Sequence, residues 1–179
     1  SDFSAQAAKM KSDGCEMVVM GTIVRETIGL MAEGKKIGFN PIWLGTTPTC
    51  VLEVPALGKE VVEGLYAGCG FDVPYRDTAT GKVKAWADAY FKQFGTEPNT
   101  QAAIGYISID TFAHYAKLAG KELTGQKMLD ALESGDAYQD IFNSPPTKFS
   151  KTNHLGNVIT LIAEVKGGRW KTLKSGLTF

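Results

Sequence analysis

The sequence predicts an α/β fold with a parallel sheet, and two patterns carry this prediction. Helical and strand-like segments alternate over residues 3–70, as they do when a crossover helix follows each parallel strand. Residues 16–21, the first strand-like segment, are almost continuously apolar, which is typical of a strand covered on both faces. We therefore expect three layers, with helices on both sides of the sheet.

Glycine and proline mark the ends of the first two helices. Apolar residues recur at helical spacing over residues 3–13, and Gly14 ends that helix. A second apolar stripe begins at Val24 and ends at Gly38, after which Pro41 prevents the helix from continuing.

Two further strands complete the predicted sheet. The first covers residues 42–45, and after an irregular stretch over residues 48–59 the second covers residues 61–70. An open sheet of this kind normally begins on a strand, whereas this chain opens on a helix. We therefore expect the natural beginning of the α/β lobe to be missing.

The middle of the chain contains three helices with no strand between them. The first begins near Thr80 and carries a strong apolar stripe up to Phe94, the second covers residues 100–119, and the third begins at Thr124. Because a parallel sheet needs alternating strands, these helices must cover some other surface.

The tail returns to strand. Residues 143–146, Asn-Ser-Pro-Pro, resemble a linker, and strands follow over residues 158–165 and 170–173. The Lys-Gly-Gly-Arg sequence between these strands is typical of a β-hairpin turn. The simplest explanation is a chain that leaves one lobe, covers another and comes back.

Charge and motif content exclude several classes of function. Lys plus Arg and Asp plus Glu number 19 each, and no basic cluster is present, so we expect no nucleic-acid or anionic-membrane partner. The longest apolar run, residues 158–165, is too short to cross a bilayer. The sequence lacks the GxGxxG, Walker, HExxH and GxSxG motifs, and His114 and His154 lie far from any nucleophile motif. We expect no enzyme activity and no cofactor.

The cysteines indicate no metal site. Cys15, Cys50 and Cys69 lack CxxC spacing and have no histidine nearby, which argues against zinc. Cys50 and Cys69 could pair in an oxidising compartment. The odd number of cysteines favours the alternative, in which all three are small buried residues with free thiols.

Short strings spread over nearly the whole chain carry a family resemblance. They are DFSAQ at 2–6, VVMG at 18–21, KIG at 36–38, WLGT at 43–46, VEGLY at 62–66, AW at 85–86 with FG at 94–95 and Pro98, GY at 105–106 with Asp110, and VKGGRW at 165–170. In this order and spacing they resemble the branched-chain amino-acid-binding proteins, which are type I periplasmic binding proteins of ABC transporters.

The resemblance implies a division of the chain between two lobes. Residues 1–75 would form the second α/β lobe without its opening portion, and residues 76–146 a hinge crossover with helices of the first lobe. Residues 147–179 would return to the second lobe with the terminal hairpin. The chain would then be the C-terminal half of a two-lobed protein, and the missing N-terminal half would be one of its partners.

The resemblance also implies a function. The two lobes would close on a small organic solute in the periplasm and deliver it to the membrane permease of an ABC transporter. The alternative is a ligand-sensing receptor ectodomain or regulator of the same fold. A Rossmann-like enzyme is disfavoured, because the sequence lacks a phosphate-binding loop.

Residues 21–25 are the first candidate ligand site, because ligands of open α/β sheets bind beyond the carboxyl ends of the strands. Free backbone N–H groups in this turn suit a carboxylate, and the Thr22 hydroxyl either adds a donor or simply caps the helix. Arg25 either binds a carboxylate or pairs in solvent with Glu26 or Glu33.

The second candidate site is the strand end at Thr46 and Thr47. The resemblance implies an acidic residue near Thr47 that would hold the ammonium group of an amino-acid ligand, but no acid occurs before Glu53. An aromatic or aliphatic carboxylic acid is therefore at least as plausible a ligand as a branched-chain amino acid.

Apolar and aromatic residues complete the predicted site. Ile23, Val24 and Phe71 would contact an apolar part of the ligand, unless they are ordinary core residues. By the resemblance Tyr106 lies on a helix near the hinge, where it could stack on or hydrogen-bond the ligand. Asp110, one turn further on, is expected to make a structural hydrogen bond.

Overall fold

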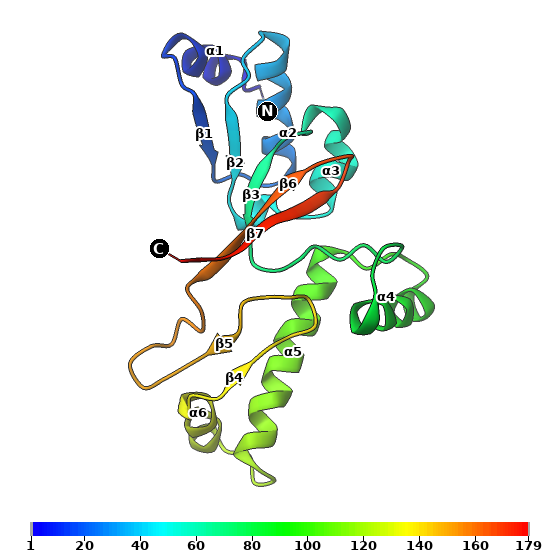
Figure 1. The fold of residues 1–179 in the computed structure, drawn as a ribbon, viewed down its shortest axis with the longest axis vertical. Helices are drawn as coiled ribbons and strands as arrows, with labels where there is room; N and C mark the ends of the chain where they lie inside the picture. Colours follow the sequence, from blue (N-terminus) through cyan, green and yellow to red (C-terminus); the bar gives the residue numbers. More distant parts are fainter. Residues whose placement is uncertain (1, 179) are drawn as a thin grey trace. The chain divides into compact units, whose positions relative to one another are not determined.

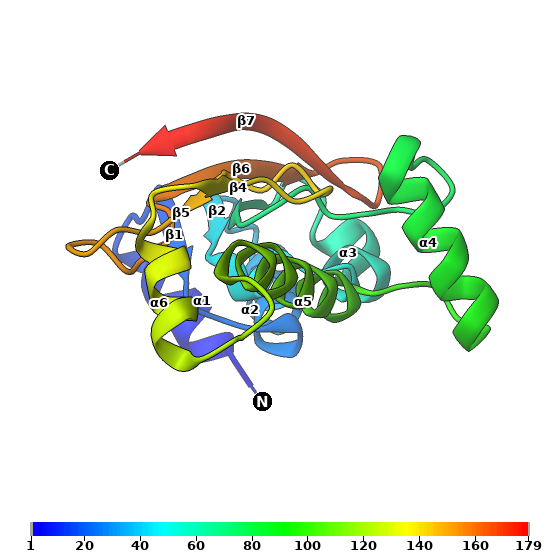
Figure 2. The same cartoon turned by 90° about the horizontal axis from the view of Figure 1, so that it is seen from below.

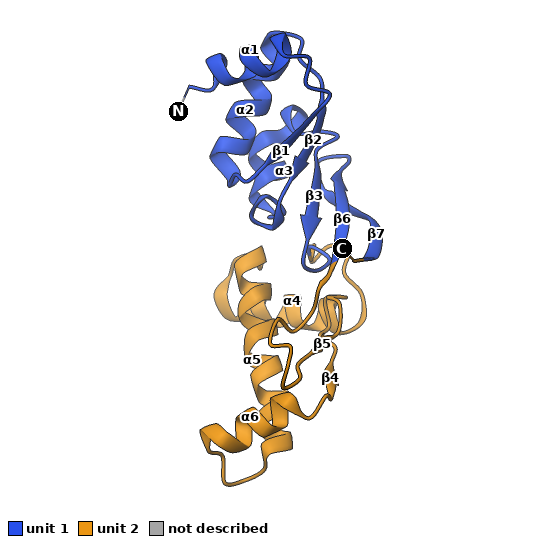
Figure 3. Ribbon diagram, turned by 90° about the vertical axis from the view of Figure 1, so that its left-hand side faces the viewer, with its two compact units in different colours: residues 1–73, 160–177 blue, residues 74–159, 178–179 orange. Residues whose placement is uncertain are grey.

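The computed structural model describes residues 2–178, and the chain divides into two compact units (Figures 1 and 3). Unit 1 comprises residues 1–73 and 160–177, and unit 2 comprises residues 74–159 with residues 178–179. The chain therefore leaves unit 1 after residue 73 and returns to it at residue 160.

Unit 1 is built on a mixed α/β sheet. Its elements are α1 (Ser4–Ser12), β1 (Met17–Met20), α2 (Val24–Lys36), β2 (Ile42–Gly45), η1 (Thr47–Thr49), α3 (Glu53–Gly58), η2 (Lys59–Val61), β3 (Tyr66–Cys69), β6 (Ile159–Val165) and β7 (Trp170–Thr178). The strand order is β1-β2-β3-β6-β7, with β1, β2 and β3 parallel and β6 antiparallel to β3. The predicted α/β class with a parallel sheet is confirmed.

Helices α1, α2 and α3 pack on one face of this sheet (Figure 3). Val18, Met20 and Trp43 point toward the helices and are buried, and Trp43 lies directly against Gly34 of α2. The opposite face is open in the described residues of unit 1, where Met17 is 51% exposed and Val19 64% exposed. The second helical layer of the predicted three-layer lobe is not found on this face of β1.

The hairpin closes with a tight turn, as its sequence predicts. Lys166 donates its backbone N–H to the carbonyl of Arg169 over 2.8 Å, and Gly167 and Gly168 have φ angles of 64° and 72°. Two consecutive positive φ angles are what a two-residue type I′ turn requires. Figure 2 shows β7 beside β6, and β7 continues to Thr178, well beyond the expected residues 170–173.

Two sequence expectations for unit 1 are wrong. Residues 48–59 are not irregular, because η1, α3 and the start of η2 occupy most of them. The strand expected at 61–70 is confined to Tyr66–Cys69, since residues 62–65 form a turn closed by a bond from the Leu65 N–H to the Val62 carbonyl over 3.1 Å. Val62 and Leu65 are apolar because they pack on the core from that turn.

Cys50 and Cys69 form a disulfide, which corrects the expectation of free thiols. Cys50 follows η1 and Cys69 ends β3, and because β2 and β3 are neighbours the two Cα atoms lie 5.6 Å apart. Both residues are buried, at 5% and 1% exposure, while Cys15 keeps a free thiol.

Unit 2 is mainly helical. It contains α4 (Gly81–Phe94), α5 (Thr100–Ala119) and α6 (Gly125–Glu133), with a short antiparallel pair, β4 (Ala137–Tyr138) and β5 (Thr147–Lys148), that the sequence did not predict. The three expected helices are confirmed. Asn99 caps α5 by accepting the Ala102 N–H over 2.9 Å. Across the described residues, no helix is long and apolar enough to span a membrane.

Candidate functional site

The predicted site residues of unit 1 gather at the carboxyl end of the parallel strands. The turn from β1 to α2 (residues 21–23) and the turn after β2 (residues 46–49) lie at the same sheet edge, because Met20 pairs with Gly45 in parallel register. We call these segments the first and second rim turns. The N–H of Thr46 donates to the carbonyl of Met20 over 3.1 Å, which joins the second rim turn to the end of β1.

The start of α2, directly after the first rim turn, has backbone donors without a partner inside the helix. The first helical bond of α2 runs from the Thr27 N–H to the Ile23 carbonyl over 3.0 Å. The N–H groups of residues 24–26 precede this bond, so they have no carbonyl one turn back within the helix. Such groups at a helix N-terminus bind carboxylates and other anions.

Thr22 serves the rim itself and does not cap α2. The capping position is occupied by Ile23, whose side chain makes no cap bond. The Thr22 hydroxyl is instead hydrogen-bonded to the Thr27 hydroxyl over 2.6 Å, and the Thr22 carbonyl accepts the Thr49 hydroxyl over 2.8 Å. Thr27 and Thr49 are fully buried, and sequence reasoning missed both of them.

Charged groups flank the first rim turn. The Arg25 side chain is 80% exposed, and its Nη2 lies 3.4 Å from Glu26 Oε1. At that distance and exposure the ion pair is weak, so the guanidinium is available to another anion. Glu26 Oε2 is buried and accepts no hydrogen bond from the described residues. From the sequence alone, Glu26 is expected only as a partner for Arg25.

The second rim turn exposes Thr46 and Thr47. The Thr46 hydroxyl lies 3.4 Å from the Met20 carbonyl, which is a long hydrogen bond, so it can turn to another acceptor. Glu53, the first acid after Thr47, lies in the first turn of α3. The second rim turn therefore offers hydroxyl groups and no carboxylate.

The apolar candidates differ in placement. Ile23 is 59% exposed at the first rim turn, whereas Val24 packs against the core of unit 1. Phe71, two residues beyond β3, is half-buried. Ile23 and Phe71 are therefore accessible to an apolar ligand, and Val24 contributes mainly to packing.

Tyr106 belongs to unit 2, where it lies in an aromatic cluster. Its ring centroid is 6.0 Å from Trp86 and 5.8 Å from Phe142, both edge-on. Burial, with the nearby Asp110 carboxylate, raises the pKa of the Tyr106 hydroxyl. Asp110 accepts a hydrogen bond from the Tyr138 hydroxyl, which confirms the structural bond expected for it.

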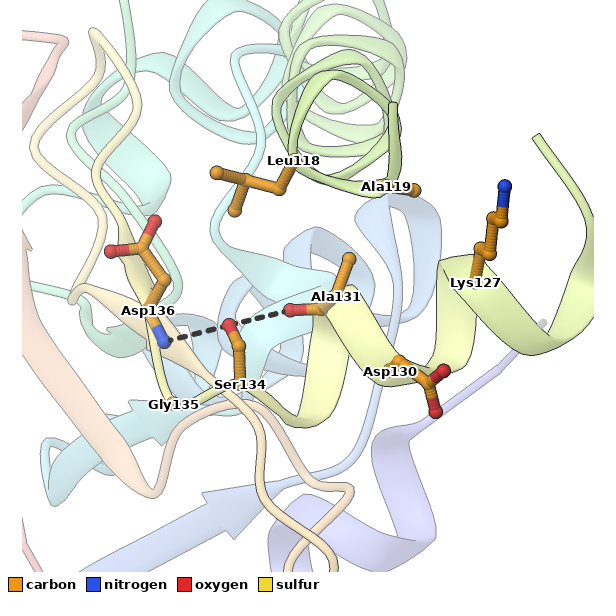
Figure 4. A pocket seen from close by; sticks show the side chains of 8 residues that line it. All are labelled: Leu118, Ala119, Lys127, Asp130, Ala131, Ser134, Gly135 and Asp136. Atoms are coloured by element: carbon orange, nitrogen blue, oxygen red, sulfur yellow. Dashed lines mark hydrogen bonds between the residues drawn. The ribbon is translucent and has the colours of Figure 1, made fainter. Parts of the chain in front are cut away.

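A hollow in unit 2 contains none of the predicted site residues. It is an open depression of about 780 Å³ in unit 2, between the end of α5 and α6 (Figure 4). Its polar groups are largely engaged: Asp130 accepts Gln126, and Ser134 Oγ bonds the Ala131 carbonyl. Among the described residues, no cluster of three His, Cys, Asp or Glu side chains could hold a metal ion.

Comparison with known proteins gives a family and several similar structures. The model of a family described as "Periplasmic binding protein" matches residues 1–169. A branched-chain amino acid ABC transporter protein from Thermus thermophilus, with bound valine, is 18% identical with a TM-score of 0.83, over 99% of this chain and 50% of that one. No curated protein matches in sequence.

Two further similar structures were solved with, or are named for, other ligands. A fatty acid ABC transporter substrate-binding protein from Thermomonospora curvata is 17% identical with a TM-score of 0.82, over 99% of this chain and 47% of that one. A solute-binding protein from R. palustris in complex with benzoate is 16% identical with a TM-score of 0.72, over 99% of this chain and 48% of that one. The chain thus spans about half the length of the structures it matches.

Proposed function

The chain belongs to the periplasmic binding protein family, and from this we propose that it is the C-terminal half of an extracytoplasmic solute-binding protein. The complete protein would close two lobes on a small solute and deliver it to the permease of an ABC transporter. Closure of this kind is a population shift driven by ligand contacts, with no covalent chemistry. The observation that carries the proposal is the family match over residues 1–169, which includes both rim turns.

We propose a carboxylate as the group that unit 1 recognises. The N–H groups at the start of α2 and the exposed guanidinium of Arg25 are suited to an anion. Valine, fatty acids and benzoate, which the similar structures are named for or contain, all carry a carboxylate. The hydroxyl-lined second rim turn, with Thr46 and Thr47, supports an acid without an α-amine.

The remaining site residues would bind the rest of the ligand. Ile23 and Phe71 would contact its apolar part from unit 1, and Tyr106 would stack on it or bond it from unit 2. Residues 1–75 and 147–179 would then belong to one lobe, and residues 76–146 to the hinge and the other lobe.

Two open apolar surfaces support a missing N-terminal half as a partner. In unit 1, Val19 and Ile42 are 64% and 50% exposed on one face of parallel strands, although such strands are normally covered on both faces. In unit 2, Ile109 and Phe112 of α5 are 70% and 51% exposed. A further α/β segment would cover these surfaces.

A thermal-shift screen of the complete polypeptide that contains this chain tests the proposal. We expect valine, leucine, benzoate or octanoate to raise the melting temperature, because a ligand that binds only the folded state stabilises it. Benzamide and octanamide are matched controls without a carboxylate, and we expect no shift with them.

Each outcome of the screen decides one part of the proposal. A shift with α-amino acids alone would contradict the argument from Thr47. Equal shifts with acids and amides would contradict recognition of a carboxylate. No shift with any small solute would contradict the solute-binding function.

A further inference from the structure

Besides the Thr46 N–H bond to the Met20 carbonyl, three ties hold residues 49–51, at the end of the second rim turn and just after it, to the rest of unit 1. The Thr49 hydroxyl donates to the Thr22 carbonyl over 2.8 Å, which joins the two rim turns. The disulfide joins Cys50 to Cys69, and the Trp170 indole donates to the Val51 carbonyl over 2.9 Å. The three ties use consecutive residues, 49 to 51, immediately after the candidate ligand groups.

The disulfide lies just beyond the last backbone pair between β2 and β3. The parallel register of these strands ends at the pair Gly45 and Ala67. Beyond that pair the chain turns away into η1, and the Cys50–Cys69 bond is the next link to the end of β3. It therefore restrains the rim turn at a point that backbone pairing does not reach.

Close packing also holds Thr49 in place. It is fully buried over Gly45, where a Cβ atom would approach Thr49 Cγ2 to 2.5 Å. The turn closes on itself through the Thr49 N–H, which donates to the Thr46 carbonyl over 2.8 Å. Thr46 and Thr47 remain exposed on a turn whose far end is fixed.

We infer that Thr49 and the Cys50–Cys69 disulfide are positioning groups that hold Thr46 and Thr47 in the geometry that binds the ligand. This inference rests on the proposed function for the ligand itself. A fixed turn loses little conformational freedom on binding, so affinity depends on the ties being intact. Full affinity then depends on oxidised cysteines, which suits an extracytoplasmic protein.

Hydrogen exchange tests, without any ligand, whether the disulfide restrains the second rim turn. In the Cys50→Ala/Cys69→Ala variant of the complete polypeptide, we expect the amides of Thr46 and Thr49 to exchange about tenfold faster, with β1 amides unchanged. Cys15→Ala is the matched control, because Cys15 has a free thiol, and its exchange should equal that of the wild type. Unchanged exchange at the rim turn, or the same acceleration throughout unit 1, would overturn the inference.

Affinity measurements test the effect on binding. Using octanoate and benzoate as probes, we expect the disulfide variant to bind about tenfold more weakly. Thr49→Val removes the hydroxyl at constant shape and should also weaken binding, whereas Thr49→Ser keeps the hydroxyl and should restore most of it.

These outcomes distinguish failure of the positioning role from failure of the proposed function. If the wild type binds neither probe, the proposed ligand class is wrong. The exchange result still decides whether the disulfide restrains the second rim turn. If the disulfide variant does not fold, the Val and Ser variants at Thr49 decide the positioning role, and equal dissociation constants for the two would overturn the inference. Wild-type affinity in a folded disulfide variant would do the same.

Discussion

At the scale of single residues, we expect replacement of Arg25 to weaken ligand binding without changing stability. Its side chain is 80% exposed and its ion-pair partner, Glu26, lies 3.4 Å away, so Arg25→Ala should change the unfolding free energy by less than about 0.5 kcal/mol. If Arg25 binds a ligand carboxylate, the same substitution should weaken binding by about tenfold to a hundredfold. Chemical denaturation and titration calorimetry measure the two effects.

The control for Arg25 is an exposed cation elsewhere. Lys82 lies in the first turn of α4 in unit 2 and is exposed, so Lys82→Ala should leave both stability and affinity unchanged. A ligand affinity that survives Arg25→Ala would remove Arg25 from the site and leave carboxylate recognition to the backbone N–H groups.

Tyr138 gives unit 2 a predictable response to high pH. Burial, followed by its hydrogen bond to Asp110, raises the pKa of the Tyr138 hydroxyl above its usual value near 10. A raised pKa means that the folded state holds this proton more tightly than the unfolded state. Its contribution to stability is therefore complete below about pH 10 and is lost as the pH rises further.

Tyr138→Phe should flatten that part of the pH profile. Denaturant unfolding at pH 8 and pH 10.5 would show a smaller loss of stability in the variant than in the wild type. Asp110→Asn is the comparison, because it removes the charged acceptor of the Tyr138 hydroxyl and should also reduce the slope. Identical slopes for all three proteins would show that Tyr138 does not govern the response.

At the scale of elements, the close approach of η1 to β2 depends on Gly45. A Cβ atom there would lie 2.5 Å from Thr49 Cγ2, so Gly45→Ala should destabilise the chain by about 1–3 kcal/mol through overpacking. Gly70→Ala is a matched control, because no atom lies within 4 Å of a Cβ at that position. Urea denaturation measures both variants.

A double-mutant cycle identifies the clash as the cause. Thr49→Gly removes the three atoms that a Cβ at Gly45 would strike, Thr49 Cγ2, Cβ and Oγ1, so Gly45→Ala should cost much less in that background. Additive costs would mean that the alanine acts through the backbone conformation of β2 and not through η1.

The same elements show what a sequence can predict. β2 and α5 match their expected bounds because local chemistry fixes them: Pro41 precedes β2, and Asn99 and Gly120 flank α5. The strand expected at 61–70 is too long because apolar content alone does not distinguish a strand from a turn packed on the core.

Contacts between distant segments account for most of what was missed at the site. The two rim turns follow from the strand order, and so do Thr22, Arg25, Thr46 and Thr47 as candidates. Thr49 bonds a residue 27 positions away, and Cys50 pairs with a residue 19 positions away. No local pattern encodes such partners, since they depend on which strands become neighbours.

At the scale of the whole molecule, a substitution on the open sheet face of unit 1 can show whether a further segment covers that face. Met17, Val19 and Ile42 are 51%, 64% and 50% exposed on that face. A charge at Val19 would be solvated in this chain, so Val19→Lys should change its unfolding free energy by less than about 0.5 kcal/mol. If a further segment of the complete protein covers the face, the same lysine is buried there and should cost about 3 kcal/mol or more.

Leu57→Lys is the control for this comparison, because Leu57 is 68% exposed on α3, the helix on the covered side of the sheet. It should be neutral both in the 179-residue chain and in the complete polypeptide. Urea denaturation of the two variants in the two backgrounds gives four values, and only Val19→Lys in the complete polypeptide should be large. A neutral result there would mean that the sheet face stays open in the complete polypeptide, and would contradict the proposal that a further segment covers it.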